Sequence, residues 1–438
     1  MEIIVVGDSI AALVALEKLR GNQGSHITWV QESDGPSGIW GGFKHGQRYL
    51  DYGMVNFELD IARNSNKVEL NDYSFSALND CANFMQSISN FLQTITETFE
   101  LPPIKILQDG KFYNDFLLSN DLKDFLDYSR THGISIQLNP GEYLHPSQKY
   151  LNVDFKNFSE NLIDYCVNIY GSSYVDNIII PWGKRLLGDD LKYLETQRHR
   201  SAWIPLYYPE TLLAAAKGEL LLKSNSFRYP VGSTISEMWR NLYNTIRGDQ
   251  NIKVAKLSDI TSPHHFGNYD LMIWATSLAK YHDRFYSNNF DVKLFKRGKI
   301  DVKFFEVDFQ SENFNYCVLN MNKHDLDWYR ATVSPNFRSP NDSSILCLES
   351  THHQDMHFVS NNLKIFDELG VNDALNIAEF KSIPVFSLPT EQERSDILSY
   401  IKSFQSRDKK LRLVGPALMP FAQTMNDQII QGLQVSNV

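Results

Sequence analysis

The sequence opens with Met1-Glu2-Ile3-Ile4-Val5-Val6-Gly7-Asp8-Ser9-Ile10-Ala11-Ala12, an apolar run that leads directly into a glycine turn. This pattern predicts a buried strand, a tight turn at Gly7 and a helix. A second apolar run, His26–Val30, ends shortly before Glu32. An acidic side chain about twenty residues after the glycine turn can hydrogen-bond the ribose of an adenine dinucleotide. The stretch therefore predicts a dinucleotide-binding unit, with an ordinary βα unit of a doubly wound fold as the alternative.

The glycine fingerprint is altered at its middle position, which Ser9 occupies. Ala12 stands at the third position, where a small residue still lets the helix pack closely against the sheet. Asp8 would add a negative charge where a phosphate is expected, so we expect it to repel a pyrophosphate. The predicted nucleotide-binding residues of this unit are Gly7, Ser9, Ala12 and Glu32.

A segment rich in small residues follows the acid, SDGPSGIWGG over residues 33–42 and GQRYLDYGMVNF over residues 46–57. It resembles the segment after the ribose-binding acid in the FAD-dependent superfamily of amine oxidases, protoporphyrinogen oxidases and UDP-galactopyranose mutases. The resemblance implies a loop that passes close to a flavin, because glycine lets backbone approach a flat ring system. The implied contacts in this loop are Gly38, Gly41, Gly42 and Gly53.

Further segments resemble the superfamily in the same order along the chain. Phe227–Ser233 resembles the stretch before a helix, and Tyr269–Thr276 resembles a strand that returns to the cofactor domain. Leu411–Gly415 resembles a strand ending in glycine, and Met425–Asp427 would open a last helix whose amides point at the flavin. The resemblance implies cofactor contacts at Ala275, Gly415, Met425 and Asn426.

Pro416 and Asn426 stand where the superfamily commonly has an arginine and an aspartate. Proline supplies neither a charge nor an amide, so the phosphate site would lose a cation. FAD is the cofactor that the resemblance implies, with NAD(P)H as a candidate external reductant. The alternative is a non-catalytic relative that has lost tight flavin binding and acts as a binding or assembly subunit.

The predicted fold is α/β, with a Rossmann-type FAD-binding domain built from residues 1–60, 215–290 and 400–438. Residues 61–214 would form a mainly helical insertion, because Asn79–Phe99 and Asn157–Tyr170 carry apolar residues at helical spacing. Residues 291–399 would form a substrate domain with an antiparallel sheet, since stretches such as Ile300–Phe305 alternate between apolar and polar residues.

Trp182, Arg198 and Arg330 are the candidate substrate residues. Trp182 with the following glycine resembles the pair that borders the nucleotide in UDP-galactopyranose mutases, and Arg198 resembles the arginine beside it. Arg330 resembles an arginine brought across the flavin, and a guanidinium offers a planar fork to a diphosphate or carboxylate. The structural alternatives are a packed tryptophan and a salt bridge within the sheet.

These resemblances imply a flavin-dependent oxidoreductase or mutase-like isomerase acting on a polar small molecule, either a sugar nucleotide or a glycan-related compound. The alternative within the superfamily is an amine oxidase or desaturase-type flavin oxidase of a small molecule. In either case the flavin would supply the chemistry, and the protein side chains would position the substrate.

Composition excludes several other classes of protein. A formal charge of −10 opposes a general nucleic-acid binder. The sequence has no apolar run near the length of a membrane span and begins with a strand pattern in place of a signal peptide, so we expect a cytoplasmic protein.

We expect no metal site, because the four cysteines form no CxxC pair and the two histidines in each of the pairs 264–265 and 352–353 would point to opposite faces of a strand. The oligomeric state is not indicated.

Overall fold

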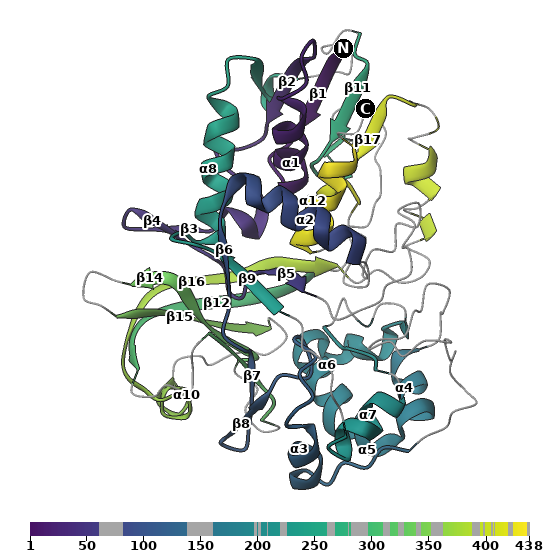
Figure 1. The fold of residues 1–438 in the computed structure, drawn as a ribbon, viewed down its shortest axis with the longest axis vertical. Helices are drawn as coiled ribbons and strands as arrows, with labels where there is room; N and C mark the ends of the chain where they lie inside the picture. The colour runs from purple at the N-terminus through teal and green to yellow at the C-terminus, as the bar shows by residue number, and fades with distance from the viewer. Residues whose placement is uncertain are drawn as a thin grey trace.

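The structure is a computed structural model that describes residues 1–60, 82–137, 161–196, 199, 203–207, 209–219, 226–260, 268–278, 280–281, 297–309, 316–322, 328–338, 343–351, 362–387, 395–396, 399–403, 406, 408–418 and 424–435. A parallel sheet lies at one end of the molecule, a mostly antiparallel sheet in the middle and a lobe of helices at the other end (Figure 1). Among the described residues, no helix combines the length and apolar character needed to cross a bilayer.

Within the described residues, five strands form the parallel sheet in the order β10-β2-β1-β11-β17. The strands are β1 (Glu2–Val6), β2 (His26–Gln31), β10 (Ile252–Lys256), β11 (Leu271–Trp274) and β17 (Leu411–Leu413). Ile3 and Val5 pack into the main core, whereas Ile4 and Val6 pack into a second cluster on the opposite face. Because both faces of the sheet are buried, β1 is apolar from Ile3 to Val6.

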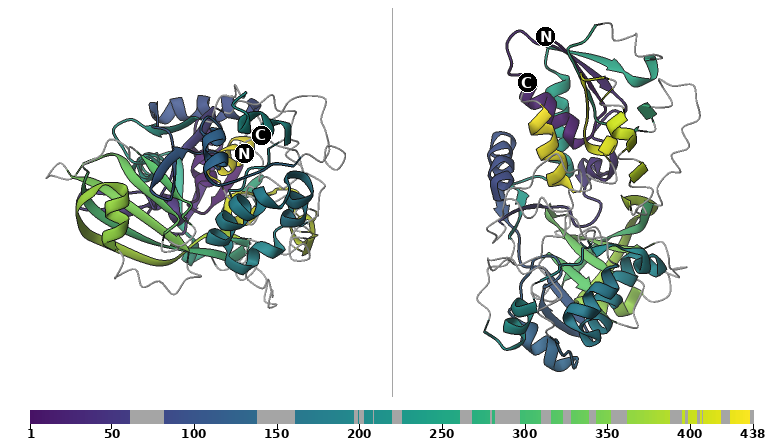
Figure 2. Two further views of the ribbon diagram at one scale, coloured as in Figure 1. Left: turned by 90° about the horizontal axis from the view of Figure 1, so that it is seen from below. Right: turned by 90° about the vertical axis from the view of Figure 1, so that its right-hand side faces the viewer.

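Helices cover the main-core face of this sheet. They are α1 (Ile10–Leu19), α8 (Ile235–Arg247) and α12 (Met425–Val435). α1 connects β1 to β2, as the opening stretch predicted, and it contacts both other helices. A Cβ added at Gly432 of α12 would lie 2.6 Å from the carbonyl oxygen of Ala11, so these two helices are in close contact. α2 (Ala82–Ile95) lies against α12 on its outer side (Figure 2).

The larger sheet has the order β16-β12-β15-β14-β13-β7-β8 over the part of the chain that the structure describes. Its neighbouring strands are antiparallel, except that β13 and β7 run parallel. The strands are β7 (Lys105–Gln108), β8 (Lys111–Asn114), β12 (Arg297–Phe309), β13 (Cys317–Asn320), β14 (Arg330–Arg338), β15 (Ser344–Thr351) and β16 (Val371–Ser387). Val302 and Phe304 face the main core while Phe305 and Val307 face a third cluster, which is the alternation expected of a strand.

The hairpin β7–β8 adds two strands from the segment that the sequence predicted to be mainly helical. Asp109 and Gly110 join these strands with positive φ angles of 51° and 76°. An Asp-Gly pair between two apolar runs is a strong hairpin signal, which the helical interpretation of this segment missed. The helical pattern from Asn79 to Phe99 also ends early, because the chain enters β6 at Thr98.

The remaining elements are short. β3 (Phe43–His45) pairs with β4 (Arg48–Leu50), and β9 (Ser226–Pro230) lies between β5 (Phe57–Asp60) and β6 (Thr98–Glu100). The helical lobe contains α3 (Phe125–Thr131), α4 (Leu162–Tyr170), α5 (Ser172–Tyr174), η3 (Val175–Ile179), α6 (Ile180–Leu187), η4 (Gly188–Tyr193) and α7 (Pro209–Ala216). Elsewhere lie η1 (Gly38–Gly41), η6 (Leu257–Asp259), α10 (Asn362–Leu369) and η8 (Gly415–Leu418).

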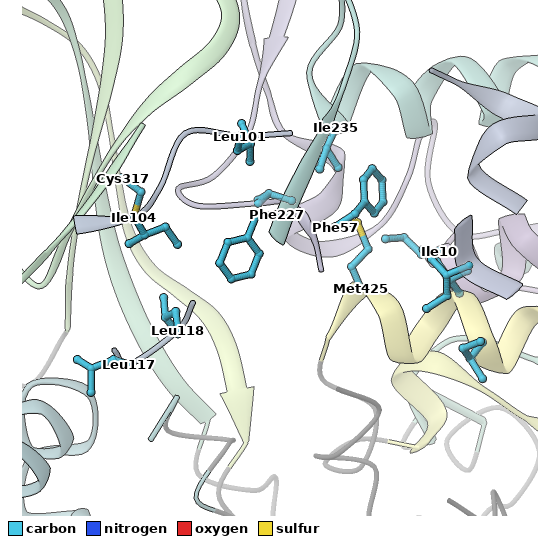
Figure 3. Packing of buried hydrophobic residues seen from close by; sticks show 14 of the residues in the cluster. Ile10, Phe57, Leu101, Ile104, Leu117, Leu118, Phe227, Ile235, Cys317 and Met425 are labelled. Atoms are coloured by element: carbon cyan, nitrogen blue, oxygen red, sulfur yellow. The ribbon is translucent and has the colours of Figure 1, made fainter. Parts of the chain in front are cut away.

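One hydrophobic core connects the parts of the molecule (Figure 3). Ile10 of α1 and Met425 of α12 lie at one side, and Phe57 and Phe227 lie between them and Cys317 of the larger sheet. Burial of this apolar surface stabilises the arrangement of the two sheets. This core contains residues of all three predicted domains, whose boundaries stay a prediction.

Candidate cofactor and substrate site

Gly7 forms the turn at the carboxyl end of β1. Its φ is +105°, and a Cβ there would lie 3.0 Å from the carbonyl carbon and oxygen of Ala275. The Gly7 amide donates a hydrogen bond of 2.9 Å to the carbonyl oxygen of Val30. Only glycine permits both this backbone conformation and the close approach. The turn therefore brings the ends of β1, β2 and β11 together at one edge of the sheet, which we call the nucleotide edge.

Ser9 begins α1 as its N-cap. Its hydroxyl accepts a hydrogen bond of 3.4 Å from the Ala12 amide, and the residue is buried. A Cβ added at Gly415, whose φ is +55°, would lie 3.1 Å from Ser9 Oγ. The predicted contacts Ser9, Ala12 and Gly415 are thus close together at the nucleotide edge.

Glu32 follows the last residue of β2. Its Oε2 accepts a 2.5 Å hydrogen bond from Thr276 Oγ1, and its Oε1 forms an ion pair with Lys280. The predicted ribose-binding acid and the turn at Ala275 therefore meet, but the carboxylate is held by the chain itself. Thr276 ends the stretch Tyr269–Thr276 that was predicted to return to the cofactor domain, whereas Lys280 was not singled out, because no local pattern relates it to an acid so far away.

Asp8 does not point along the start of α1 toward an expected phosphate. Its Oδ2 accepts hydrogen bonds from the amides of Glu32 (2.7 Å) and Ser33 (2.6 Å) and from the Ser33 hydroxyl (3.0 Å). Burial raises the pKa of Asp8 to about 6, although the bonds from Ser33 act in the opposite direction. The amides of Glu32 and Ser33 thus hold one oxygen of the Asp8 carboxylate, Oδ2, and the repulsion of a pyrophosphate by Asp8 stays a prediction.

The start of α12 is tied to neighbouring elements. Thr424 and Asp427 cap each other's amides at 3.0 and 3.1 Å. Met425 Sδ accepts a 3.3 Å hydrogen bond from Trp239 Nε1, and Asn426 Nδ2 donates one of 2.8 Å to the Glu58 carbonyl. The predicted cofactor contacts Met425 and Asn426 are thus buried and bonded to α8 and β5.

Buried polar atoms without a hydrogen-bond partner gather at the nucleotide edge. In the described part of the chain they include Asp8 Oδ1, Gln31 Nε2, Gln428 Oε1 and Gln431 Nε2. Gln428 Oε1 lies 3.4 Å from the Cβ position of Gly415, and Gln431 Oε1 accepts a 2.6 Å bond from the Gly415 amide. A buried polar atom left unpaired costs about 1–3 kcal/mol. Together with Gly7 and Glu32, these atoms fit a polar dinucleotide better than they fit a closed apolar core.

Packing within the protein accounts for three of the four predicted flavin-loop glycines. A Cβ at Gly41 would collide with the Pro36 carbonyl oxygen, one at Gly42 with Ser236 Oγ, and one at Gly53 with the Glu349 carboxylate. Gly38 differs, since a Cβ there would meet no heavy atom of the protein within 4 Å. Gly38 is therefore the glycine of this loop that leaves space beside its backbone.

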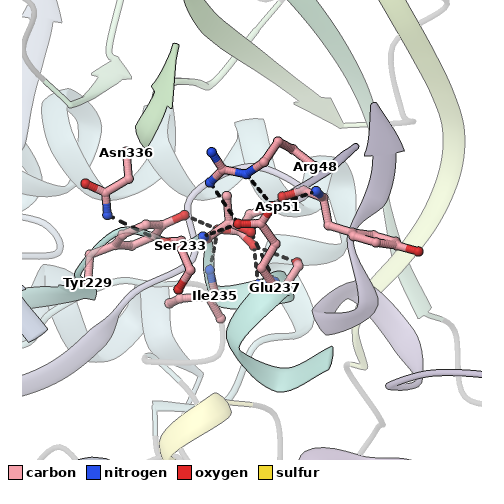
Figure 4. Close-up of polar contacts among 10 residues, drawn as sticks. Arg48, Asp51, Tyr229, Ser233, Ile235, Glu237 and Asn336 are labelled. Carbon is pink, nitrogen blue, oxygen red and sulfur yellow. Dashed lines mark hydrogen bonds and ion pairs between the residues drawn. The ribbon is translucent and has the colours of Figure 1, made fainter. Parts of the chain in front are cut away.

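Asp51 caps the start of α8 (Figure 4). Its carboxylate accepts hydrogen bonds from the Ser236 amide (2.7 Å), the Ser236 hydroxyl (2.6 Å), the Ile235 amide (3.2 Å) and the Tyr229 hydroxyl. Burial raises the pKa of Asp51. Arg48 Nε and Nη2 bind the Glu237 carboxylate at 2.6 and 2.8 Å on the same helix turn. These contacts fix the β3–β4 hairpin to α8.

Arg330 forms a buried ion pair with Glu349, its direct cross-strand partner in the β14–β15 pair. The Nε–Oε1 and Nη2–Oε2 distances are 2.7 and 2.5 Å. Glu349 also accepts bonds from the Tyr329 hydroxyl (2.7 Å) and the Met54 amide (3.0 Å). The structural alternative for Arg330, a salt bridge within the sheet, is what the structure contains. Glu349 was missed, although an acid after the apolar run Ile345–Leu348 is a usable signal.

Part of the Arg330 guanidinium has no hydrogen-bond partner. Its buried Nη1 has none, and its Cζ lies 4.6 Å from the ring centroid of Trp203 and 5.4 Å from that of Tyr329. Burial alone would lower the pKa of Arg330, but the Glu349 carboxylate raises it above its ordinary value. The guanidinium is therefore a permanent cation in an aromatic frame.

Trp182 lies in α6 with its side chain fully buried. Its ring centroid is 6.5 Å from that of Tyr329, and its Nε1 has no hydrogen-bond partner. The following Gly183 packs against Leu191. Trp182 and Arg330 thus both lie near Tyr329, whereas Arg198 lies outside the described residues.

Metal ligands were not expected, and the described residues contain no group of three or more His, Cys, Asp or Glu side chains that could hold a metal ion. The histidine pairs at 264–265 and 352–353 lie outside the described residues, as does Cys81. Cys166, Cys317 and Cys347 are buried free thiols.

Comparison with solved structures identifies the fold. The chain is similar over its whole length to a reduced UDP-galactopyranose mutase, with 12% identity, 94% of that chain covered and a TM-score of 0.65. A fatty acid isomerase from P. acnes that produces CLA gives 11% identity over 99% of this chain and 97% of that chain, with a TM-score of 0.55. A putrescine oxidase bound to putrescine gives 10% identity over 100% of this chain and 98% of that chain, with a TM-score of 0.52.

No protein-family model and no curated protein sequence matches the chain. The solved structures establish the fold, which is that of the superfamily that the sequence resembles. The resemblance is therefore confirmed at the level of the fold.

Proposed function

We propose that this protein is a FAD-dependent enzyme of the oxidoreductase or mutase type. The observation that carries the proposal is the match of the whole chain to a UDP-galactopyranose mutase and an oxidase, combined with Gly7 and Glu32 at the nucleotide edge. A chain that shared only one βα unit with these proteins would not match them from end to end.

Residues of the nucleotide edge would hold the cofactor. Glu32 would exchange its bond from Thr276 for one from a ribose hydroxyl, and the first amides of α1 would face the pyrophosphate. Gln428 and Gln431 would direct their unpaired atoms to the polar part of the same molecule. A bound flavin would supply the redox or nucleophilic chemistry, while the protein orients the substrate and excludes water.

The substrate residues of the proposal are Trp182 and Arg330, with Arg198 as a further candidate. Trp182 and Arg330 lie beside Tyr329, and a polar molecule of the sugar type suits their mixture of rings and N–H donors. A nicotinamide reductant is not part of the proposal, because neither the fold comparison nor a described site supports one.

Flavin binding tests the proposal directly. We expect the purified protein to show flavin absorbance, or to gain thermal stability when FAD is added. Glu32→Ala should weaken FAD binding by about 1.5–3 kcal/mol, since the ribose loses a bond to a charged acceptor.

The matched control is Glu2→Ala, which removes an exposed carboxylate from the other end of the sheet and should leave FAD affinity unchanged. A folded wild-type protein that is colourless and is not stabilised by FAD would contradict the proposal. Equal FAD affinity in Glu32→Ala and the wild type would remove Glu32 from the site.

A further inference from the structure

We infer that the site beside Arg330 takes an uncharged ligand through an accepting oxygen, and that it does not take the diphosphate for which an arginine fork was predicted. The inference rests on the proposed function in one respect, since it takes the ligand of this site to be the substrate. It adds that this substrate is an uncharged, glycan-related compound and that no nucleotide diphosphate binds beside Arg330.

The charge of Arg330 is already balanced inside the protein. Glu349 is fully buried and binds the guanidinium through both of its carboxylate oxygens. This arrangement uses the Nε–Nη2 edge, which is one of the two forks that could clamp a phosphate. The pair as a whole is neutral, so it offers little attraction to an anion.

A diphosphate at this place would also meet repulsion. The Glu349 carboxylate is held against Gly53 and Met54 and cannot move away without breaking its bonds from Tyr329 and Met54. Two like charges a few ångströms apart repel more strongly in a buried site than in water. The buried carboxylate therefore selects against anionic ligands.

Two N–H donors of the proposed site, both near Tyr329, have no hydrogen-bond partner among the described residues. They are Arg330 Nη1 and Trp182 Nε1, and both residues are buried. A hydroxyl or carbonyl oxygen can accept from such donors without bringing a net charge. Satisfying them recovers the cost of burying unpaired polar atoms, so a neutral acceptor is the complementary ligand.

Aromatic rings complete the site. Trp203 stacks on the Arg330 guanidinium, is only partly buried, and has a positive φ of 51°. A bulky residue held in this backbone conformation is strained, and such strain often marks a functional position. Trp203 therefore combines partial exposure with contact to the Arg330 guanidinium, and its ring would be the part of the proposed site nearest to solvent.

The test compares UDP with uridine, which differ by the diphosphate. UDP or uridine is titrated calorimetrically into the full chain in the presence of excess FAD. The FAD is needed because UDP could also bind at the nucleotide edge, so only the binding measured in its presence is compared. We expect the wild type to favour UDP over uridine by less than about tenfold. A preference of about tenfold or more would overturn the inference, since it would require a net positive site.

Glu349→Gln sharpens the test. The substitution leaves Arg330 without its counter-charge, so UDP should bind about tenfold or more tightly than to the wild type, with uridine unchanged. Glu379→Gln is the matched control, because Glu379 lies in the same sheet and pairs with Lys303 at 3.5 Å. UDP affinity should stay at the wild-type value in this control.

If neither UDP nor uridine binds the wild type in the presence of FAD, the inference is overturned. A folded Glu349→Gln protein with unchanged near-ultraviolet circular dichroism and no gain in UDP affinity would overturn it. If Glu349→Gln does not fold, the wild-type comparison of UDP with uridine decides alone. Absence of flavin would contradict the proposed function, and the gain in UDP affinity of Glu349→Gln over the wild type would then decide the inference, because this substitution changes only the site beside Arg330.

Discussion

Asp51 and Glu349 are both buried carboxylates that lie close to the same loop, yet the protein balances them in different ways. Asp51 accepts hydrogen bonds from neutral donors at the start of α8, whereas Glu349 faces the Arg330 guanidinium. Burial raises the pKa of Asp51, because neutral donors compensate only part of its lost hydration. The difference teaches that two carboxylates can both be buried and still have partners of different charge. For Glu349, the charge of its partner Arg330 determines which ligands the neighbouring site can bind.

The largest effect is expected from Arg330→Met. This change leaves the Glu349 charge buried without a counter-ion, so the free energy of unfolding should fall by about 3–5 kcal/mol. Urea denaturation followed by circular dichroism measures the loss. Adding Glu349→Gln should restore much of the stability, whereas equal losses in the single and double variants would contradict the charge-balance argument.

Asp8→Asn should change how stability depends on pH. The pKa of Asp8 in the folded protein is about 6, above the ordinary value of 3.8, because burial disfavours its charged form. This carboxylate therefore destabilises the folded wild type above about pH 6, and the penalty disappears as the pH falls toward 4. Relative to Asp8→Asn, the wild type should gain about 2–3 kcal/mol of unfolding free energy between pH 7 and pH 4. Parallel pH profiles of the two proteins would show that the Asp8 pKa is ordinary.

Asp51→Asn tests the carboxylate that has no cation as its partner. An amide NH2 group would face donors on α8, so the free energy of unfolding should fall by about 1–3 kcal/mol. Asp270→Asn is a suitable control, because Asp270 accepts a 2.9 Å bond from the Glu2 amide at an exposed position. A loss in Asp51→Asn no larger than in this control would remove Asp51 as the cap of α8.

The smallest effect is expected from Thr234→Ala at the same helix start. Thr234 and Glu237 form a reciprocal capping box, and loss of the hydroxyl should cost about 1 kcal/mol. Thr245→Ala removes an exposed threonine from the same helix and should have almost no cost. Thermal unfolding of both variants gives the comparison, and equal melting temperatures would contradict the capping role.

The nucleotide edge was predictable from the sequence, because each of its features is signalled by a short stretch of neighbouring residues. The run from Ile3 to Val6, the turn at Gly7 and the acid at Glu32 each carry their own signal, and all three occur where expected. The direction of Asp8 was not predictable, since it depends on which amides of a distant loop lack acceptors.

The substrate region was less predictable because its contacts depend on strand register. Arg330 and Glu349 are separated by a hairpin whose register places them directly opposite each other, and a shift by one residue would turn Glu349 to the other face of the sheet. From the sequence, Arg330 was compatible with either an anion site or a salt bridge. The register of β14 and β15 places Glu349 opposite Arg330 and so produces the salt bridge.

The close contact between α1 and α12 has a consequence for how the protein is made. Gly432, which packs against Ala11, is synthesised more than four hundred residues after it. At about 5–20 residues per second, the apolar face of α1 waits tens of seconds for this partner. During that time the face is a candidate for binding by chaperones, so the packing of α1 is complete only after α12 has been synthesised.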